Sequence, residues 1–173
     1  MQNKRGISQA FSNAPTGLQL RKAVVADVFD VSKVLVRSIT ELCASDHSDD
    51  PDLVARWTAN KDPESILNCI RFGEDIWLAD LNGQIAGVAS LRNGAEVSRL
   101  YVCPDHVSRG VGTALLNRLE QRLLSKGCDQ AHLKATTTAR TFYMRRGWQL
   151  EDTSTDWYGI QQFHMIKRLR AEG

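Results

Sequence analysis

Residues 96–124 read EVSRLYVCPDHVSRGVGTALLNRLEQRLL and carry the pattern around which the chain is organised. The segment 96–102 is rich in β-branched and large apolar residues, which predicts a strand. Apolar residues recur at helical spacing over 114–124, which predicts an amphipathic helix. Between the two lies a turn that contains Gly110 and Gly112. A glycine turn at the start of a helix directs several backbone N–H groups toward one point, so this stretch predicts a phosphate-binding site.

Length and composition indicate one globular domain. The chain has 173 residues, of which 42% are hydrophobic and 24% charged, and its net charge is +2. This balance argues against a strongly basic nucleic-acid-binding protein. We expect no membrane partner either, because no apolar run approaches the roughly 18 residues that a spanning helix needs. The polar start lacks the apolar core of a signal peptide, so we expect a cytoplasmic protein with a flexible tail over 1–17 and a single domain over 18–170.

The cysteine pattern predicts reduced thiols and no metal site. None of the four cysteines forms a C-x-x-C pair, and none stands at zinc-ligand spacing with a histidine. Cys103 follows the predicted strand and is either a reactive thiol or a packing residue.

The order of the predicted elements is β-α-α-βββ-α-β-α-ββ. Asn82-Gly83 gives the clearest hairpin signal, and Asp46 to Pro51 is predicted as an acidic loop. The predicted strands are 18–22, 76–80, 85–91, 96–102, 132–135, 148–151 and 162–166, the last two being joined through 153–158. The predicted helices begin near Ala26, Pro51, Asp62, Gly110 and Ala139.

The glycine turn matches neither of two common nucleotide motifs. A P-loop needs Lys and then Ser or Thr after its second glycine, where this chain has Thr113 and Ala114. The dinucleotide pattern needs a third glycine, where this chain has Leu115. An ordinary helix start remains the alternative for this stretch taken by itself.

Two windows resemble the GCN5-related N-acetyltransferase family. Residues 107–112, VSRGVG, are similar to its motif A, Q/R-x-x-G-x-G/A, with Val107 in the place of the usual Gln or Arg. Residues 139–148, ARTFYMRRGW, are similar to its motif B, A-x-x-F-Y-x-x-x-G-F. The resemblance covers about residues 18–168. It implies the family's acyl-CoA N-acyltransferase fold, an α/β (α+β) architecture with a central, mixed, mostly antiparallel and splayed sheet flanked by helices.

The resemblance also implies acetyl-CoA as co-substrate and no metal. In the family the turn holds the pyrophosphate, and the preceding strand pairs with the pantetheine arm. Arg109, Arg145, Ser108 and Thr113 each have an ordinary surface or capping role as the alternative. The residues that would bind the cofactor are Leu100, Tyr101, Val102, Val107, Ser108, Arg109, Gly110, Val111, Gly112, Thr113, Thr138 and Arg145.

Two residues are candidates for catalysis. Tyr143 matches the motif B tyrosine that family members use as a general acid toward sulfur, and a phenol holds its proton at neutral pH. Glu96 is the candidate base, because histone-type members carry a catalytic glutamate in this strand. Strand alternation would place Glu96 on one face with Ser98, Leu100 and Val102. The alternatives are a packing role for Tyr143, and for Glu96 an exposed position paired with a nearby arginine.

The acceptor is expected to be a primary amine of a small molecule or a peptide. The first two predicted helices and their loop would form its pocket, and they contain Asp46, His47 and Trp57. Acidic groups beside tryptophan suit a cationic amine. A solvated acidic loop with Trp57 in the core is the alternative, and His47 is a second candidate base. We expect a monomer or a homodimer that transfers the acetyl group directly. The alternative function is a non-catalytic acyl-CoA-binding or regulatory domain.

Overall fold

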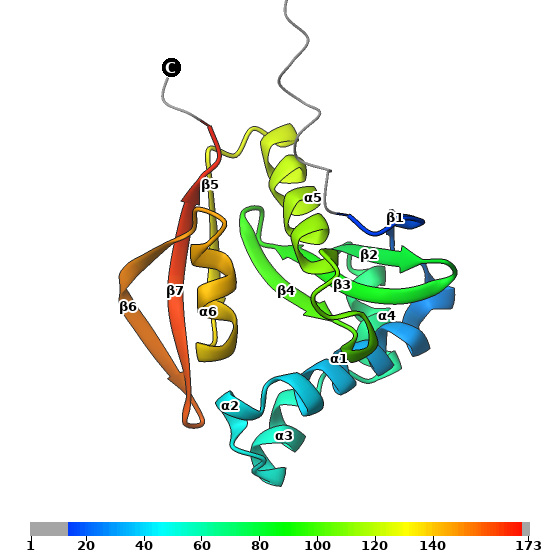
Figure 1. Ribbon diagram of the computed structural model, residues 1–173, viewed down its shortest axis with the longest axis horizontal. Coiled ribbons are helices and arrows are strands. Elements are labelled where there is room, and N and C mark those ends of the chain that lie inside the picture. Colours follow the sequence, from blue (N-terminus) through cyan, green and yellow to red (C-terminus); the bar gives the residue numbers. More distant parts are fainter. Residues whose placement is uncertain (1–13, 171–173) are drawn as a thin grey trace, which may run out of the picture.

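The computed structural model describes residues 14–170, so residues 1–13 of the tail expected over 1–17 lie outside that range. The described chain forms one seven-stranded sheet with the strand order β1-β2-β3-β4-β5-β7-β6 (Figure 1). Its strands are β1 (Leu18–Lys22), β2 (Asp75–Leu81), β3 (Gln84–Arg92), β4 (Glu96–Val102), β5 (Gln130–Ala135), β6 (Gln149–Trp157) and β7 (Ile160–Arg168). Its helices are α1 (Val28–Leu42), α2 (Ala44–His47), α3 (Pro51–Thr58), α4 (Pro63–Arg71), α5 (Val111–Ser125) and α6 (Thr137–Met144), with 3-10 turns η1 (Val25–Asp27) and η2 (Pro104–His106).

Helices cover both faces of the sheet, as the alternating order of elements predicts. Helix α5 packs on one face through its leucines, among them Leu115, Leu119 and Leu123, which are fully buried. Helices α1 and α4 pack on the other face through Val31, Leu35 and Ile66. Burying two apolar helix faces against one sheet provides the hydrophobic driving force for this fold. The predicted fold class is confirmed.

The first hairpin follows directly from the sequence. Asn82 and Gly83, between β2 and β3, have φ values of 54° and 83°. Both residues lie in the left-handed region that a two-residue hairpin turn requires. At Gly87 of β3, an added side chain would come within 3.0 Å of Leu115 and Val111, so this glycine lets α5 approach the sheet closely.

A β-bulge changes the expected face of β4. Arg92 pairs with Glu96, but Ser90 pairs with Arg99, so β4 carries one extra residue at this point. As a result Val97, Leu100 and Val102 all pack toward α5. The expectation that Glu96 shares a face with Leu100 and Val102 is wrong, because the bulge shifts the alternation of side chains between them.

Strands β4 and β5 pair only at one end. They are parallel, and the partners are Glu96 with His132 and Val97 with Leu133. Beyond these two pairs the strands diverge, and β5, β7, β6 and α6 stand apart from β1–β4 in Figure 1. The splay leaves one side of the remainder of β4 free of a neighbouring strand.

Two regions differ from the predicted elements. The last two strands are longer than expected and meet at the tight turn Tyr158-Gly159, so 153–157 is strand and not connection. The polar side chains of this ribbon are exposed, which hides it from a search for apolar alternation. Ala44–His47, which overlaps the first two residues of the expected acidic loop, forms one turn of helix just after α1.

Candidate active site

The glycine turn forms the start of helix α5 and lines a cavity of about 450 Å³. Ser108 and Gly110 have φ values of 59° and 80°, a conformation that glycine adopts without strain. The first N–H groups of α5 have no acceptor within the helix, and they are concentrated at this turn. Gly112 is buried, and an added side chain would lie 3.4 Å from Phe142 and from Val102. The turn therefore presents backbone donors in a recess that any side chain at Gly112 would crowd.

Several predicted turn residues line this cavity, and one does not. Arg109 is exposed and is absent from the lining. Val107 is also exposed, which suits a position that contributes backbone alone. Those of the predicted set that the structure brings together here are Val102, Val107, Ser108, Gly110, Val111, Gly112, Thr113 and Arg145.

Arg146 is a cavity residue that the sequence analysis missed. Its guanidinium donates to Thr113 Oγ1 at 2.6 and 3.0 Å and to the Phe142 carbonyl at 2.7 Å. It also lies 3.7 Å from the centre of the Phe142 ring, and burial lowers its pKa. Arg146 lies in the turn that follows α6, at a position that the motif over 139–148 leaves unspecified, so no sequence signal pointed to it.

A second cavity, of about 330 Å³, opens where β4 and β5 diverge. Its walls are residues 97–102 of β4, the end of β5, helix α6 and the helices α1 and α3. Leu100, Tyr101, Val102, Trp57, Thr138 and Tyr143 are the predicted site residues that line it. Val102 and Phe142 line both this cavity and the recess at the turn, so the two cavities adjoin.

Tyr143 lies in the wall of this central cavity. It is 6% exposed, and its ring makes edge contacts with Phe142 and Trp148, with centroids 5.2 and 5.9 Å apart. Burial, followed by the nearby Tyr101, raises the pKa of its phenol above the ordinary value of about 10. Tyr143 is therefore protonated at neutral pH and is held in place by packing.

A second phenol faces the same cavity. The Tyr101 hydroxyl accepts a hydrogen bond of 3.2 Å from Trp57 Nε1, which joins β4 to α3. Burial raises the pKa of Tyr101 to about 12, the hydrogen bond from Trp57 partly opposing that shift. The family resemblance implies only backbone contacts for Tyr101, but its side chain also forms part of the cavity wall next to α3.

His47 and Asp46 have structural contacts. His47 is 1% exposed, its Nε2 lies 3.0 Å from the Ile39 carbonyl, and its Nδ1 accepts from the Asp49 N–H at 3.1 Å. Both ring nitrogens thus have backbone partners, and His47 does not line the central cavity. Asp46 Oδ1 accepts from the Thr138 N–H of α6 at 3.1 Å.

Glu96 lies at the point where β4 and β5 pair, away from the central cavity. Its carboxylate is 2.9 Å from Arg92, one of the partners expected for a structural role. The structure does not place Glu96 among the residues that line the cavity.

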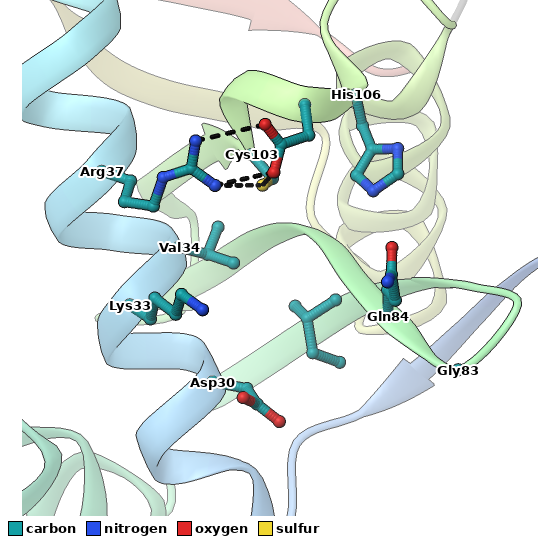
Figure 2. Close-up of a pocket in the computed structure, with 10 residues that line it drawn as sticks. Asp30, Lys33, Val34, Arg37, Gly83, Gln84, Cys103 and His106 are labelled. Atoms are coloured by element: carbon teal, nitrogen blue, oxygen red, sulfur yellow. Dashed lines mark hydrogen bonds and ion pairs between the residues drawn. The ribbon is translucent and has the colours of Figure 1, made fainter.

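A third cavity, of about 250 Å³, lies between α1, the start of β3 and η2 (Figure 2). The Arg37 guanidinium crosses its edge to reach Asp105 at 2.7 Å and the Cys103 sulfur at 3.8 Å. Asp30 and Lys33 border it from α1, and His106 lines both this cavity and the recess at the turn. Cys103 is a buried thiol beside this ion pair. It does not line the central cavity, where an acyl carrier would have to lie.

Residues 14–170 contain neither a cluster of metal ligands nor a membrane-spanning helix. No group of three or more His, Cys, Asp or Glu side chains in this range could hold a metal ion. No helix in the described part of the chain has both the length and the apolar character needed to cross a bilayer.

Residues 43–169 match the family model of the acetyltransferase (GNAT) domain. An acetyltransferase of Pectobacterium atrosepticum is 38% identical over 87 residues, covering 47% of this chain and 60% of that protein. The chain thus spans little more than half the length of the first curated relatives it matches. An uncharacterised N-acetyltransferase, YafP of Escherichia coli, is 28% identical over 76% of this chain and 81% of its own length.

Solved structures agree with the family model. A GCN5-related N-acetyltransferase from Rhodopseudomonas palustris superposes with a TM-score of 0.78 at 28% identity, over 87% of this chain and 94% of that one. The PaiA N-acetyltransferase of Thermoplasma acidophilum, solved with coenzyme A, has a TM-score of 0.73 at 20% identity, over 87% and 98% of the two chains. The family model covers well over half of the sequence, and the chain belongs to the GNAT acetyltransferase family.

Proposed function

We propose that the protein transfers an acetyl group from acetyl-CoA to a primary amine of a small molecule or peptide, directly and within a ternary complex. One observation carries the proposal. The free side of β4, beyond Val97, borders a cavity that leads into the backbone donors at the start of α5, and Tyr143 faces that cavity.

The residues of the two adjoining cavities fit acetyl-CoA. Backbone groups of Leu100, Tyr101 and Val102 would pair with the amides of the pantetheine arm, as a peptide adds to an open strand edge. The N–H groups of the turn would receive the pyrophosphate, together with the positive end of the helix dipole. Arg145 and Arg146 line the same recess and would neutralise phosphate charge. Solved relatives with coenzyme A or acetyl-CoA bound support this choice of co-substrate.

Acetyl-CoA supplies an activated acyl group as a thioester, and the protein would position it and manage the protons. The main-chain N–H groups along the free part of β4 would polarise the carbonyl oxygen. Tyr143 would donate its proton to the departing sulfur. Its raised pKa keeps the phenol protonated at the pH of the reaction, which an acid requires.

The acceptor amine must lose a proton before or during attack. Glu96 would accept that proton through water, because its carboxylate is paired with Arg92 and lies outside the lining of the cavity. Trp57 lines the cavity from α3, and its aromatic ring favours a cationic amine.

The proposal is tested in two steps. Calorimetric titration of the protein with acetyl-CoA should show saturable binding. No binding at millimolar acetyl-CoA would contradict the proposal. An amine library of aminoglycosides, polyamines, amino acids and peptides, assayed by release of free thiol, should then identify an acceptor. Tight binding without turnover on any amine would favour the non-catalytic acyl-CoA-binding domain.

A further inference from the structure

Asp46 supplies the hydrogen bond that helix α6 lacks at its own start. The N-cap residue of α6, Thr136, makes no side-chain hydrogen bond to the first turn. Asp46 Oδ1, from α2 and 92 positions earlier in the chain, instead accepts from the Thr138 N–H at 3.1 Å. An acidic side chain at this point also interacts favourably with the positive end of the helix. Asp46 therefore caps α6 across the open side of the sheet.

We propose that Asp46 is a positioning residue for acetyl transfer, setting the place of α6 and hence of Tyr143 relative to β4. The inference rests on the proposed function, because it concerns the acid of that reaction. Thr138, Ala139, Phe142 and Tyr143 all face the central cavity from α6. Tyr143 follows Thr138 by five residues, about 7.5 Å along the helix, so a displaced first turn shifts the phenol as well.

The splay of the sheet explains why such a contact is needed. Beyond Val97 and Leu133 no ladder holds β4 against β5. Within the described chain, two side-chain contacts from α2 and α3 span this gap, away from the β4–β5 pairs. One is Asp46 with Thr138, and the other is the Arg56 guanidinium, which lies 4.5 Å from the ring centre of Tyr158 on the β6–β7 turn. These side-chain contacts replace the missing strand pairing in holding the two halves of the site together.

The surroundings of Asp46 favour a capping role over a surface one. Its second oxygen, Oδ2, is buried and has no hydrogen-bond partner within residues 14–170. Its charge adds to burial in raising the pKa of Cys43, which lines the cavity, to about 12. The Asp46 carboxylate is thus bonded to α6 and lies near Cys43 of the cavity wall.

The experiment compares Asp46→Ala and Asp46→Asn with Asp52→Ala, a matched control at a nearby aspartate. Asp52 is exposed in the first turn of α3. For each variant, hydrogen exchange is measured over residues 136–144, together with the Kd for acetyl-CoA, kcat and the KM for the amine. Asp46→Ala should speed exchange in this peptide about fivefold and lower kcat to a similar degree, as expected for a lost cap. The Kd for acetyl-CoA should stay within about twofold, because the α5 turn is intact.

Asp46→Asn keeps a side-chain oxygen for the Thr138 N–H and should restore most of the exchange protection and kcat. Normal exchange in Asp46→Ala, or equal losses in Asp46→Ala and Asp52→Ala, would overturn the inference. So would an Asp46→Asn variant with protected α6 but a strongly raised KM for the amine, because that result assigns Asp46 to ammonium recognition. If Asp46→Ala does not fold, the exchange of Asp46→Asn decides alone, and unprotected residues 136–144 in that variant contradict the inference.

The exchange measurement needs no turnover. If no amine is acetylated by the wild-type protein, the proposed function fails while the exchange still reports on the Asp46 cap. If the wild-type protein is active and exchange over 136–144 is unaffected by Asp46→Ala, the positioning role fails and the proposed function stands.

Discussion

The Arg146 guanidinium donates to Thr113 Oγ1 at 2.6 Å and so ties the end of α6 to the first turn of α5. Residues that are 33 positions apart thereby line one recess, in which a cation lies beside the backbone donors of the glycine turn. The contact connects the two sequence motifs physically, because each supplies one wall of the proposed phosphate site.

Arg146→Ala should weaken binding of acetyl-CoA about tenfold, the effect of losing one charge-assisted hydrogen bond. The change is measured as Kd by calorimetry. Arg140→Ala is the matched control, since Arg140 lies within α6, close in sequence to Arg146, but its guanidinium is 4.5 Å from the ring centre of Phe163. An unchanged Kd for Arg146→Ala, or an equal loss in both variants, would assign Arg146 to packing alone.

Tyr143→Phe should lower kcat at least about tenfold while the Kd for acetyl-CoA changes little, because only the proton donor is removed. The ring contacts with Phe142 and Trp148 remain in the variant. Since the pKa of Tyr143 is raised, the wild-type rate should show no loss from its ionisation below about pH 10. Tyr158→Phe, at the exposed β6–β7 turn, is the control and should retain full activity. Equal rates for wild type and Tyr143→Phe would exclude the acid role.

Glu96→Gln tests the proposed water-mediated base. If Glu96 accepts the proton, kcat/KM for the amine falls about tenfold in steady-state assays and the Kd for acetyl-CoA is unchanged. Arg92→Met is the companion variant, because it removes the partner at 2.9 Å and keeps the carboxylate. A structural pair instead predicts small, equal losses of melting temperature in both variants with normal kcat.

The buried Lys61 should make the stability of the fold change with pH above about pH 8. It is 8% exposed, and burial, followed by the charge of Arg99, lowers its pKa to about 8 from an unfolded value of about 10.4. Between these two pH values the unfolded chain binds more protons than the folded chain, so the free energy of unfolding rises with pH over this window. The full cost of burying the charged ammonium is present below about pH 8. Lys61→Met should therefore be more stable than wild type at pH 7, by at most about 3 kcal/mol.

Urea unfolding of both proteins from pH 7 to 10 measures this difference, which should shrink as the pH rises. Lys33→Met, on the exposed face of α1, is the control and should show no such trend. A difference between Lys61→Met and wild type that is constant with pH would show that the ammonium is not destabilised by burial.

Local chemistry was sufficient for most of the fold. Residues 18–22 and 96–102 form strands with the predicted bounds, and Asn82-Gly83 forms the predicted turn, because strand patterning and left-handed turn residues act over a few neighbouring positions. The glycine turn could be predicted for the same reason, because the positive φ at Gly110 and the buried position of Gly112 each require glycine within a few residues of the helix start. The β6–β7 ribbon was underestimated, because its polar residues give no alternating pattern.

The sequence by itself determined the family, the element order and the turn at the start of α5, all of which depend on residues close together in the chain. Tertiary structure decided which side chains meet at the cavity. The bulge beside Ser90 turned Glu96 away from the face of Leu100, and packing brought Arg146 to Thr113 and Asp46 to Thr138. These contacts join residues 33 and 92 positions apart, and they form only when the diverging strands β4 and β5 place the helices around one gap. Periodicity along the chain carries no information about such distances, because they are set by how the layers pack.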